Sequence, residues 1–436
     1  MFAAIAPVGS LLFGLALLLL GHGLQGALLG VRADLEGFSS QATGIIMSAY
    51  FVGFVISLPF LPRLVRLIGH IRTFTALASL ASSAILVHAM IIDPYIWFAM
   101  RLITGVCFAG LYMVVESWIN ERTTNATRGA VLSVYMIVSM TGIALGYQLF
   151  GLADPSSFVP FILASILISV ALVPVALTRT LQPQPIETAR LGIRDLYRLS
   201  PLGVVGMMIG GLTQGAHFGM AGVSAAGLGL NPLQIGTFLA LSSYGAMVLQ
   251  GPIGFLSDRF DRRIVLVGTA FLAACAALGV YVASSMGTRE LFGASFLLGG
   301  VMMPLYALSI AHTNDHAQPE DLVEVATGLL LVFGFGASLG PAIAGLVMGW
   351  FGPAALFIHI AVLTTVLGVF GLIRMLARAP VPAEEQAPYV PMTRTSPVVF
   401  ELDPRYEPEQ PELPLEGQYR DQRRQDKPAR RVRQAA

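Results

Sequence analysis

The sequence predicts an all-α membrane protein in which twelve transmembrane helices form two pseudo-symmetric six-helix bundles. Three observations predict this fold. Of the 436 residues, 55% are hydrophobic and only 12% are charged, with a mean hydropathy of +0.73, which leaves too little charge to cover a soluble protein of this length. Apolar stretches long enough to cross a bilayer recur along the chain. Residues of the first half also recur, at a nearly constant spacing, in the second half.

The apolar stretches fall into two groups of six, separated by a polar segment. A hydrocarbon core of about 30 Å needs roughly 20 apolar residues per helix. We therefore expect spans at 7–30, 43–64, 74–92, 95–118, 130–150 and 158–177, and then at 202–225, 235–256, 265–283, 291–310, 325–348 and 354–376. The first stretch is kept as a helix because it lacks the positive start and the cleavage site of a signal peptide. The expected organisation is an N-terminal half at 1–178, a cytoplasmic linker at 179–200, a C-terminal half at 201–378 and a tail at 379–436.

The arginines predict the orientation of these spans. With a cytoplasmic N-terminus, the outer loops hold only Arg32 and Arg289, whereas the inner loops hold Arg63, Arg66, Arg72, Arg122, Arg128, Arg179, Arg190, Arg194, Arg198, Arg259, Arg262 and Arg263. By the positive-inside rule both termini are then cytoplasmic. The tail is rich in Pro, Glu, Gln and Arg, a composition that buries too little apolar area to fold, so we expect it to be disordered. A partner-binding role for the tail stays open.

Sliding the chain on itself by about 194 residues indicates an internal duplication. The matches include Tyr50 with Tyr244, Tyr112 with Tyr306, Asn120 with Asn314, Gly142 with Gly336 and Gly146 with Gly340. At a slightly different shift, Gln25 matches Gln214. Transporter folds are often built from such repeats. Because both halves lie in one chain, we expect the functional unit to be a monomer.

The loop at 254–263 carries a recognisable motif. Its sequence, GFLSDRFDRR, resembles the G-x-L-x-D-R-x-G-R-R loop of the major facilitator superfamily, with Asp261 where a second glycine is usual. An acid at a helix end beside arginines can form ion pairs that exist in only one gate state. Asp258, Arg259, Arg262 and Arg263 are therefore the candidate gating loop. The matching loop at 62–72 has Arg66 in the place of the acid.

Two further motifs lie within the spans. Arg101 to Gly105 is similar to the R-x-x-x-G pattern of that superfamily's fourth helix, and 336–345 resembles its antiporter motif, which usually lies in helix five. Helix five here has Tyr147 in place of the proline, so antiport stays an open expectation. Small residues at this spacing let helices approach closely. The predicted helix-packing residues are Gly142, Gly146, Gly336, Gly340 and Pro341.

The stretch from Val114 to Ser117, with Arg128, Gly129, Leu132, Tyr135 and Met136, resembles the bacterial YcaD-like branch of the superfamily. The resemblance covers roughly residues 12–378. It implies the twelve-helix major facilitator fold in a bacterial inner membrane, and a transporter that is not an enzyme.

Other classes of protein lack their expected residues in this sequence. The only lysine is Lys427, and no phosphate-binding G-x-x-x-x-G-K motif is present, which excludes an ATP-driven pump of that type. We expect no cofactor and no metal, because the intramembrane histidines are scattered over different helices. The sequence has no cluster of basic residues that would indicate binding to nucleic acid. The lipid bilayer and a small-molecule substrate, with protons, are the expected partners.

Polar residues inside a membrane are costly and are functional candidates by default. The predicted substrate cavity comprises Gln25, Tyr50, Arg101, Tyr112, Gln214, His217, Tyr244 and Tyr306. Three alternatives stay open: the glutamines can bond across helices as structural glue, a lone His217 can bond a neighbouring carbonyl, and Arg101 can bond backbone carbonyls. Glu116 and His217 are the candidates for proton coupling, with a helix-end ion pair as the alternative role of Glu116.

The expected activity is secondary active transport of a small organic solute by alternating access, coupled to protons and directed outward. Uptake or facilitated diffusion of a small metabolite stays open, as does a transceptor that signals through the tail. A carboxylate deep in the first helix, frequent among proton-coupled members of the superfamily, is missing from this sequence.

Overall fold

A computed structural model describes residues 8–124, 127–176, 192–318, 321–377, 381–382, 386, 388–390 and 395–402, and every regular element in those residues is a helix. Ten helical segments among them are long and apolar enough to cross a membrane. They are α2 (Gly9–Leu35), α3 (Ser40–Ser57), α5 (His70–Met90), α6 (Pro94–Glu121), α7 (Arg128–Phe150), α12 (Pro232–Arg259), α13 (Arg262–Ala283), the α14–α15 pair (Thr288–Asn314), α16 (Leu322–Phe351) and α17 (Ala355–Ala377).

Two further segments complete the twelve predicted spans. The sixth is divided into α8 (Val159–Val170) and α9 (Leu172–Ala176), and the seventh is the glycine-rich α11 (Pro201–Gly227), whose 27 residues extend about 40 Å. The tenth is divided into α14 (Thr288–Met302) and α15 (Pro304–Asn314). Pro304 begins the new helix because proline lacks the N–H that would continue the old one. With these two segments, each of the twelve predicted spans corresponds to one or two helices of the structure.

Within the described ranges, three short helices lie outside the helices of these spans. α4 (Leu61–Ile68) begins inside the predicted second span, 43–64, and continues four residues beyond it, and α10 (Ile193–Leu199) lies within the predicted linker. The third, η4 (Pro397–Leu402), lies in the predicted tail. The other linker residues before Gly192, and the tail beyond Leu402, lie outside the described residues.

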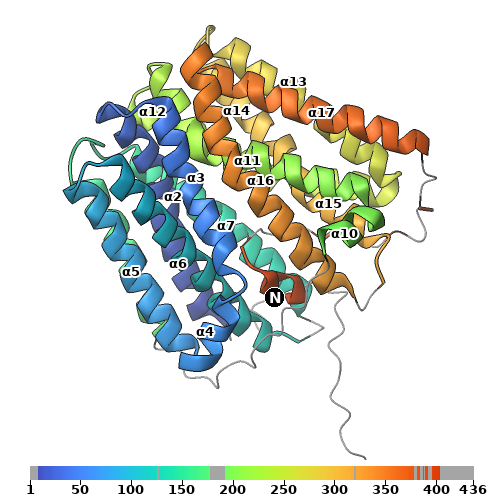
Figure 1. Cartoon of the computed structure of the whole chain (residues 1–436), viewed down its shortest axis with the longest axis horizontal. Helices are drawn as coiled ribbons and strands as arrows, with labels where there is room; N and C mark the ends of the chain where they lie inside the picture. Colours follow the sequence, from blue (N-terminus) through green and yellow to red (C-terminus); the bar gives the residue numbers. More distant parts are fainter. Residues whose placement is uncertain are drawn as a thin grey trace, which may run out of the picture. The chain divides into compact units, whose positions relative to one another are not determined.

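The same helix pairs recur in the two parts of the chain, which Figure 1 colours from blue to teal and from green to orange. α2 packs on α7 and α8, and α3 packs on α6; correspondingly, α11 packs on α16 and α17, and α12 packs on α14. Glycines permit the closest contacts. A Cβ atom on Gly146 of α7 would lie 2.3 Å from the carbonyl oxygen of Leu20, and one on Gly340 of α16 would lie 2.3 Å from that of Leu212.

Gly142 and Gly336 lie beside these contacts, on the same helix faces. A Cβ on Gly142 would lie 3.0 Å from the Leu19 Cβ, and one on Gly336 would lie 2.4 Å from the carbonyl oxygen of Met208. We call α2 to α9 the N-terminal set of helices and α11 to α17 the C-terminal set. The predicted helix-packing glycines thus occupy equivalent positions in the two sets.

The two sets of helices meet where α3 packs on α16 and where α7 packs on α12. A Cβ on Gly44 would lie 2.4 Å from the carbonyl oxygen of Pro341, one on Gly345 would lie 2.4 Å from that of Ser40, and one on Gly236 would lie 2.3 Å from that of Tyr147. These contacts lie near the α2–α3, α7–α8 and α11–α12 loops, which we call the arginine-poor end. The end with the α6–α7 and α12–α13 loops is called the arginine-rich end. At these positions the backbones of the two sets of helices are in contact.

At the arginine-rich end, part of the predicted tail is packed into the protein. Val398, Val399 and Phe400 of η4 are 1%, 0% and 3% exposed, and η4 contacts α6, α7 and α16. The expectation of a disordered tail from residue 379 is wrong for this segment. The physical reason is local: three consecutive apolar residues find an apolar surface to cover, although the average composition of the tail is polar.

Candidate substrate cavity

A cavity of about 150 Å³ lies between the two sets of helices. Its walls come from α2, α3, α6 and α7 on one side and from α11, α12, α16 and the α14–α15 break on the other, and Thr395 forms part of the wall. No aspartate, glutamate or lysine lines it among the described residues. Most of the wall is aromatic or aliphatic, as is usual for sites that bind organic molecules.

Arg101 places a positive charge at this cavity. Its side chain lies on α6, which begins at Pro94 after Asp93 caps the backbone N–H groups of Tyr95 and Ile96. Arg101 is only 4% exposed, and its guanidinium carbon lies 4.8 Å from the centre of the Tyr50 ring. Its Nε and Nη1 atoms have no hydrogen-bond partner within the described residues. The predicted alternative, in which carbonyls satisfy this arginine, therefore leaves two of its nitrogens unexplained.

Three predicted tyrosines, Tyr50, Tyr112 and Tyr306, also line the cavity. Tyr306 meets Phe333 edge-to-face at 5.0 Å between ring centres. His22, which was not among the predicted site residues, lines the same wall and lies 5.2 Å from the Tyr50 ring. Arg101 of α6 and His22 of α2 thus both lie beside the Tyr50 ring.

Four predicted cavity residues, Gln25, Gln214, His217 and Tyr244, do not line this cavity. The Gln214 amide donates to the carbonyls of Met302 and Met303, at 3.3 and 3.5 Å, where α14 ends and α15 begins. The Met303 carbonyl also accepts the backbone N–H of Tyr306, at 3.4 Å. Gln214 therefore joins α11 to a helix break, which corresponds to the structural alternative for the glutamines.

The other three lie in helix contacts. His217 Nε2 and Ser242 Oγ are 3.0 Å apart, which joins α11 to α12. Gln25 is fully buried, and no partner for its amide is present in the described part of the chain. Tyr244 is half-buried and packs beside the apolar core.

Glu116 lies about 22 Å along α6 from Arg101, by the helical rise, and is fully buried near the arginine-rich end. Its carboxylate accepts hydrogen bonds from Tyr135 of α7 and from Thr395 and Ser396 of the tail. The hydroxyls of Tyr135 and Thr395 are themselves 3.1 Å apart. Since Thr395 also lines the cavity, this carboxylate is one side chain removed from the cavity wall.

The predicted gating loop forms a cluster of ion pairs around Arg262, which is 1% exposed. Arg262 Nη1 lies 2.6 Å from Asp315 Oδ1 and 3.0 Å from the carbonyl oxygen of Ala311, while its Nη2 lies 3.3 Å from Asp258 Oδ1. Arg263 pairs with Asp261 at 2.7 Å. These partners all come from α12, α13 and the end of α15. The described ion pairs of the loop therefore stay within one set of helices.

Two other contacts extend from this loop. Arg259 is exposed and lies over the Phe255 ring at 5.8 Å. Asp258 Oδ1 accepts the backbone N–H of Tyr389, at 2.6 Å. Burial raises the pKa of the Tyr389 hydroxyl well above its ordinary value, so this side chain stays neutral beside Asp258.

Comparison with known proteins places this geometry in context. The family model of the Major Facilitator Superfamily matches the chain twice, over residues 11–204 and 203–402. The chain is 28% identical over 359 residues to the MFS-type transporter YcaD of Escherichia fergusonii, which covers 81% of this chain and 92% of the relative. The YcaD protein of Escherichia coli O9:H4 matches with the same identity and coverage.

Solved structures share the arrangement of helices. The crystal structure of the nucleoside transporter NupG superposes with a TM-score of 0.69 at 13% identity, covering 84% of this chain and 98% of that one. A bacterial homolog of the human lysosomal transporter Spinster, in an inward-facing and occupied conformation, superposes with a TM-score of 0.69 at 12% identity, covering 87% and 97%. At this identity the likeness shows the fold alone.

Proposed function

Because the chain belongs to the major facilitator superfamily and is a membrane transporter of that type, we propose that it moves a small organic solute through the cavity at Arg101 by alternating access. The duplicated helix pairs and the double match of the family model support two six-helix halves, at 1–178 and 201–378, that rock about this cavity. A bacterial inner membrane with both termini in the cytoplasm is part of the proposal, and so is a monomeric unit.

The observation that carries the substrate class is the buried, partly unpartnered guanidinium of Arg101. A buried charge without a partner is strongly unfavourable, and no carboxylate among the described lining residues compensates it. A solute with a carboxylate, sulfonate or phosphate group would supply the two missing acceptors. The aromatic wall formed by Tyr50, Tyr306 and Phe333 suits an aromatic or aliphatic body on the same molecule. We therefore propose a small organic anion as the cargo.

Proton coupling is the second part of the proposal. Glu116 is the better candidate, because Thr395 joins its carboxylate to the cavity wall. His217 bonds Ser242 and does not line the cavity. Outward movement with proton antiport is the direction that we propose. Facilitated diffusion or uptake is the alternative, and it differs in a measurable way, since it needs no titrating group.

The substrate class can be tested without knowing the cargo. Purified protein is screened by thermal shift against organic anions and their neutral amide or alcohol analogues, and the best ligand is then used for flux into liposomes. We expect anions to raise the Tm and their neutral analogues to leave it unchanged. Equal stabilisation by both members of each pair would overturn the proposed class.

Arg101→Lys tests the role of the guanidinium in the same assays. Lysine keeps the positive charge but loses the planar fork that can bond two acceptor atoms. Loss of one charged hydrogen bond, worth about 1.5–3 kcal/mol, should weaken anion binding roughly tenfold to hundredfold. Arg289→Lys, at an exposed position far along the sequence, is the matched control and should bind normally. Wild-type affinity in the Arg101 variant would leave this residue with a packing role.

Glu116→Gln tests proton coupling. If Glu116 carries the proton, flux through this variant should no longer depend on a pH gradient, although counterflow of the anion with equal pH on both sides should persist. Unchanged pH dependence in the Gln variant would favour facilitated diffusion or another proton site. A protein that binds ligand but shows no flux in any assay would favour the transceptor alternative.

A further inference from the structure

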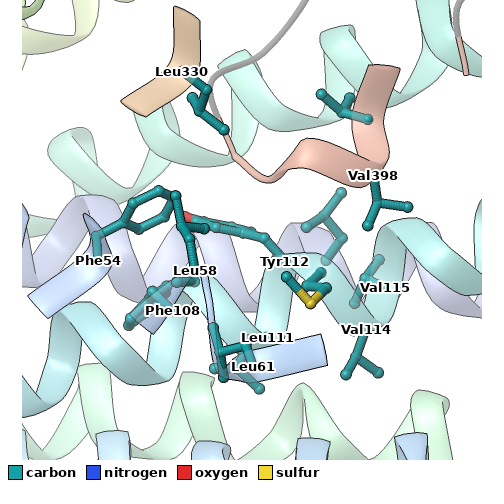
Figure 2. Packing of buried hydrophobic residues seen from close by; sticks show 14 of the residues in the cluster. Phe54, Leu58, Leu61, Phe108, Leu111, Tyr112, Val114, Val115, Leu330 and Val398 are labelled. Carbon is teal, nitrogen blue, oxygen red and sulfur yellow. The ribbon is translucent and has the colours of Figure 1, made fainter. Parts of the chain in front are cut away.

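The segment 395–402 lies against α6, α7 and α16 at the arginine-rich end of the cavity, and we call the surface that these three helices form the groove. Val398 and Val399 are buried against α6, α7 and α16, and Figure 2 shows Val398 facing Val115 of α6 with Leu330 of α16 in the same cluster. The polar side chains of the segment are also bonded there, since the hydroxyls of Thr395 and Ser396 both donate to the Glu116 carboxylate. Apolar and polar contacts together therefore define one binding position for this segment.

A second contact of the tail lies on the opposite set of helices. The Tyr389 ring lies against Gly254 of α12, where a Cβ on the glycine would come within 2.4 Å of the ring. The backbone N–H of Tyr389 donates to Asp258 of the same helix. Gly254 and Asp258 belong to the loop motif that the sequence identified. Between Tyr389 and Phe400, the tail thus contacts helices of both sets.

We propose that this groove is a docking site for the chain's own tail, through Tyr389 and residues 395–402, which closes the cavity toward the arginine-rich end and holds the two sets of helices in one relative position. The inference deepens the proposed function, because its inhibitory consequence rests on transport through that cavity. At the arginine-poor end the backbones of the two sets of helices are in contact at Gly44, Gly236 and Gly345. With the tail docked, the two sets are joined at both ends.

Docking and substrate passage exclude each other for two reasons. Thr395 forms part of the cavity wall, so a solute that leaves toward the arginine-rich end must displace it. Alternating access also requires the two sets of helices to change their relative position, and a segment bound to both resists that change. When the docked state holds about nine-tenths of the molecules, the apparent affinity for a ligand that needs the open state falls about tenfold.

The charge at Glu116 favours this occupant over a bound solute. An organic anion in the groove would lie against a buried carboxylate, whereas the tail brings two hydroxyl donors to it, from Thr395 and Ser396, beside the one that Tyr135 of α7 supplies. The groove at Glu116 and the cavity at Arg101 therefore prefer opposite ligands: hydrogen-bond donors at the first and acceptors at the second.

Accessibility of the cavity wall tests docking without any substrate. In a Cys275→Ser background, Ser139→Cys places a thiol on the α7 wall, and Cys107 stays buried. Labelling by a bulky hydrophilic maleimide is compared in detergent between the full chain, a chain ending at residue 404 and a chain ending at residue 387. We expect slow labelling in the first two and roughly tenfold faster labelling in the third. Equal rates in the last two chains would overturn the docking proposal.

Two further variants keep the test decisive if the short chain folds poorly. Val399→Asp in the full chain places a charge in the apolar groove and should raise labelling as the deletion does. A synthetic peptide of residues 388–404, added to the 387-residue chain, should restore protection, and a peptide with the same Val399→Asp change should not. Failure of both would overturn the proposal whatever the deletion shows.

Anion flux in liposomes then separates docking from inhibition. The 387-residue chain should transport several-fold faster than the 404-residue chain, and the peptide should slow it. If the thiol becomes accessible while flux stays equal in both chains, the segment docks without inhibiting, and the regulatory inference is wrong although transport is established. If neither chain shows flux, the accessibility result still tests docking, and the proposed function fails separately.

Discussion

The α12–α13 turn and the connection from α3 to α5 occupy matching places in the duplicated sequence, but they hold charge in different ways. In the α12–α13 turn, Arg262 is buried between Asp258 and Asp315. In the matching connection, Arg66 stands where the acid is expected, lies on the short helix α4 and is exposed. His70, in the place of Arg262, instead packs against Trp118 with 5.8 Å between the rings.

The two sets of helices also differ in which buried carboxylate they hold at the arginine-rich end and in what bonds it. In the C-terminal set, Asp315 at the end of α15 is paired by Arg262 from the motif. In the N-terminal set, the buried acid is Glu116 on α6, and the tail supplies two of its partners. The tail thus contributes hydrogen bonds on the side where the loop motif has lost its acid. Substitutions in the two copies can separate these roles.

Arg262→Gln should have the largest effect on stability. The substitution removes the cation that lies 2.6 Å from the Asp315 carboxylate, whose side chain is only 2% exposed, and breaking a buried pair costs about 3–5 kcal/mol. The Tm in detergent should fall clearly, whereas Arg66→Gln in the matching loop should change it little. The double variant Arg262→Leu, Asp315→Leu should recover much of the loss, because it removes the buried carboxylate as well. A single variant as stable as the wild type would mean that water reaches Asp315.

The turn residues before α5 and α13 provide the next comparison. Gly69 has φ +85° and ψ 159°, a conformation that only glycine adopts readily, so Gly69→Asn should cost about 1–3 kcal/mol. Asp261 has φ −52° and caps the Arg263 N–H at 3.0 Å. Asp261→Asn keeps that cap and loses only a partly exposed ion pair, worth up to about 1 kcal/mol. Thermal unfolding of the two variants should therefore rank Gly69→Asn as the less stable.

The stability difference between wild type and Asp261→Asn should depend on pH. Burial alone would raise the pKa of Asp261, but hydrogen bonds from Arg263 outweigh it and lower the pKa below the ordinary 3.8. A lowered pKa stabilises the folded state above that value and ceases to do so as the pH falls through the folded pKa. The stability difference between wild type and Asp261→Asn should therefore be constant near neutral pH and shrink in acid. A difference that grows in acid would exclude the pairing with Arg263.

The fold was predictable from the sequence because bilayer thickness imposes a length on every apolar span. The exceptions are local: the break at Met303 follows from Pro304, and the end of α3 at Ser57 left α4 as a separate helix. The docked tail was missed because composition was averaged over residues 379–436. Three apolar neighbours, Val398 to Phe400, are a small part of that average but enough to fill a groove.

The candidate cavity was predicted in part, and the errors have a common origin. Searching for residues shared by the two halves selected Gln25, Gln214 and Tyr244, but shared residues also reflect shared helix packing. His22 and Tyr147 line the cavity, yet they align with Gly211 and Pro341 in the second half, so the search excluded them. Arg101 was identified without any match in the other half, from its charge inside a membrane span and from the motif that it begins at 101–105.

The smallest effect is expected at Asp258, whose side chain is 40% exposed. An ion pair this accessible contributes about 0.2–1 kcal/mol, so Asp258→Asn should change a gating rate by less than about tenfold. Neither Asp258 nor Arg262 lines the cavity, and anion affinity should therefore stay the same while flux slows. The measurement belongs in the chain that ends at residue 387, because in the full chain Asp258 also accepts the Tyr389 N–H and a weaker tail contact would speed flux. Arg66→Gln in that background should leave both affinity and flux unchanged. Equal, large losses of anion binding in the two variants would show that these loops shape the cavity itself and not the exchange between its states.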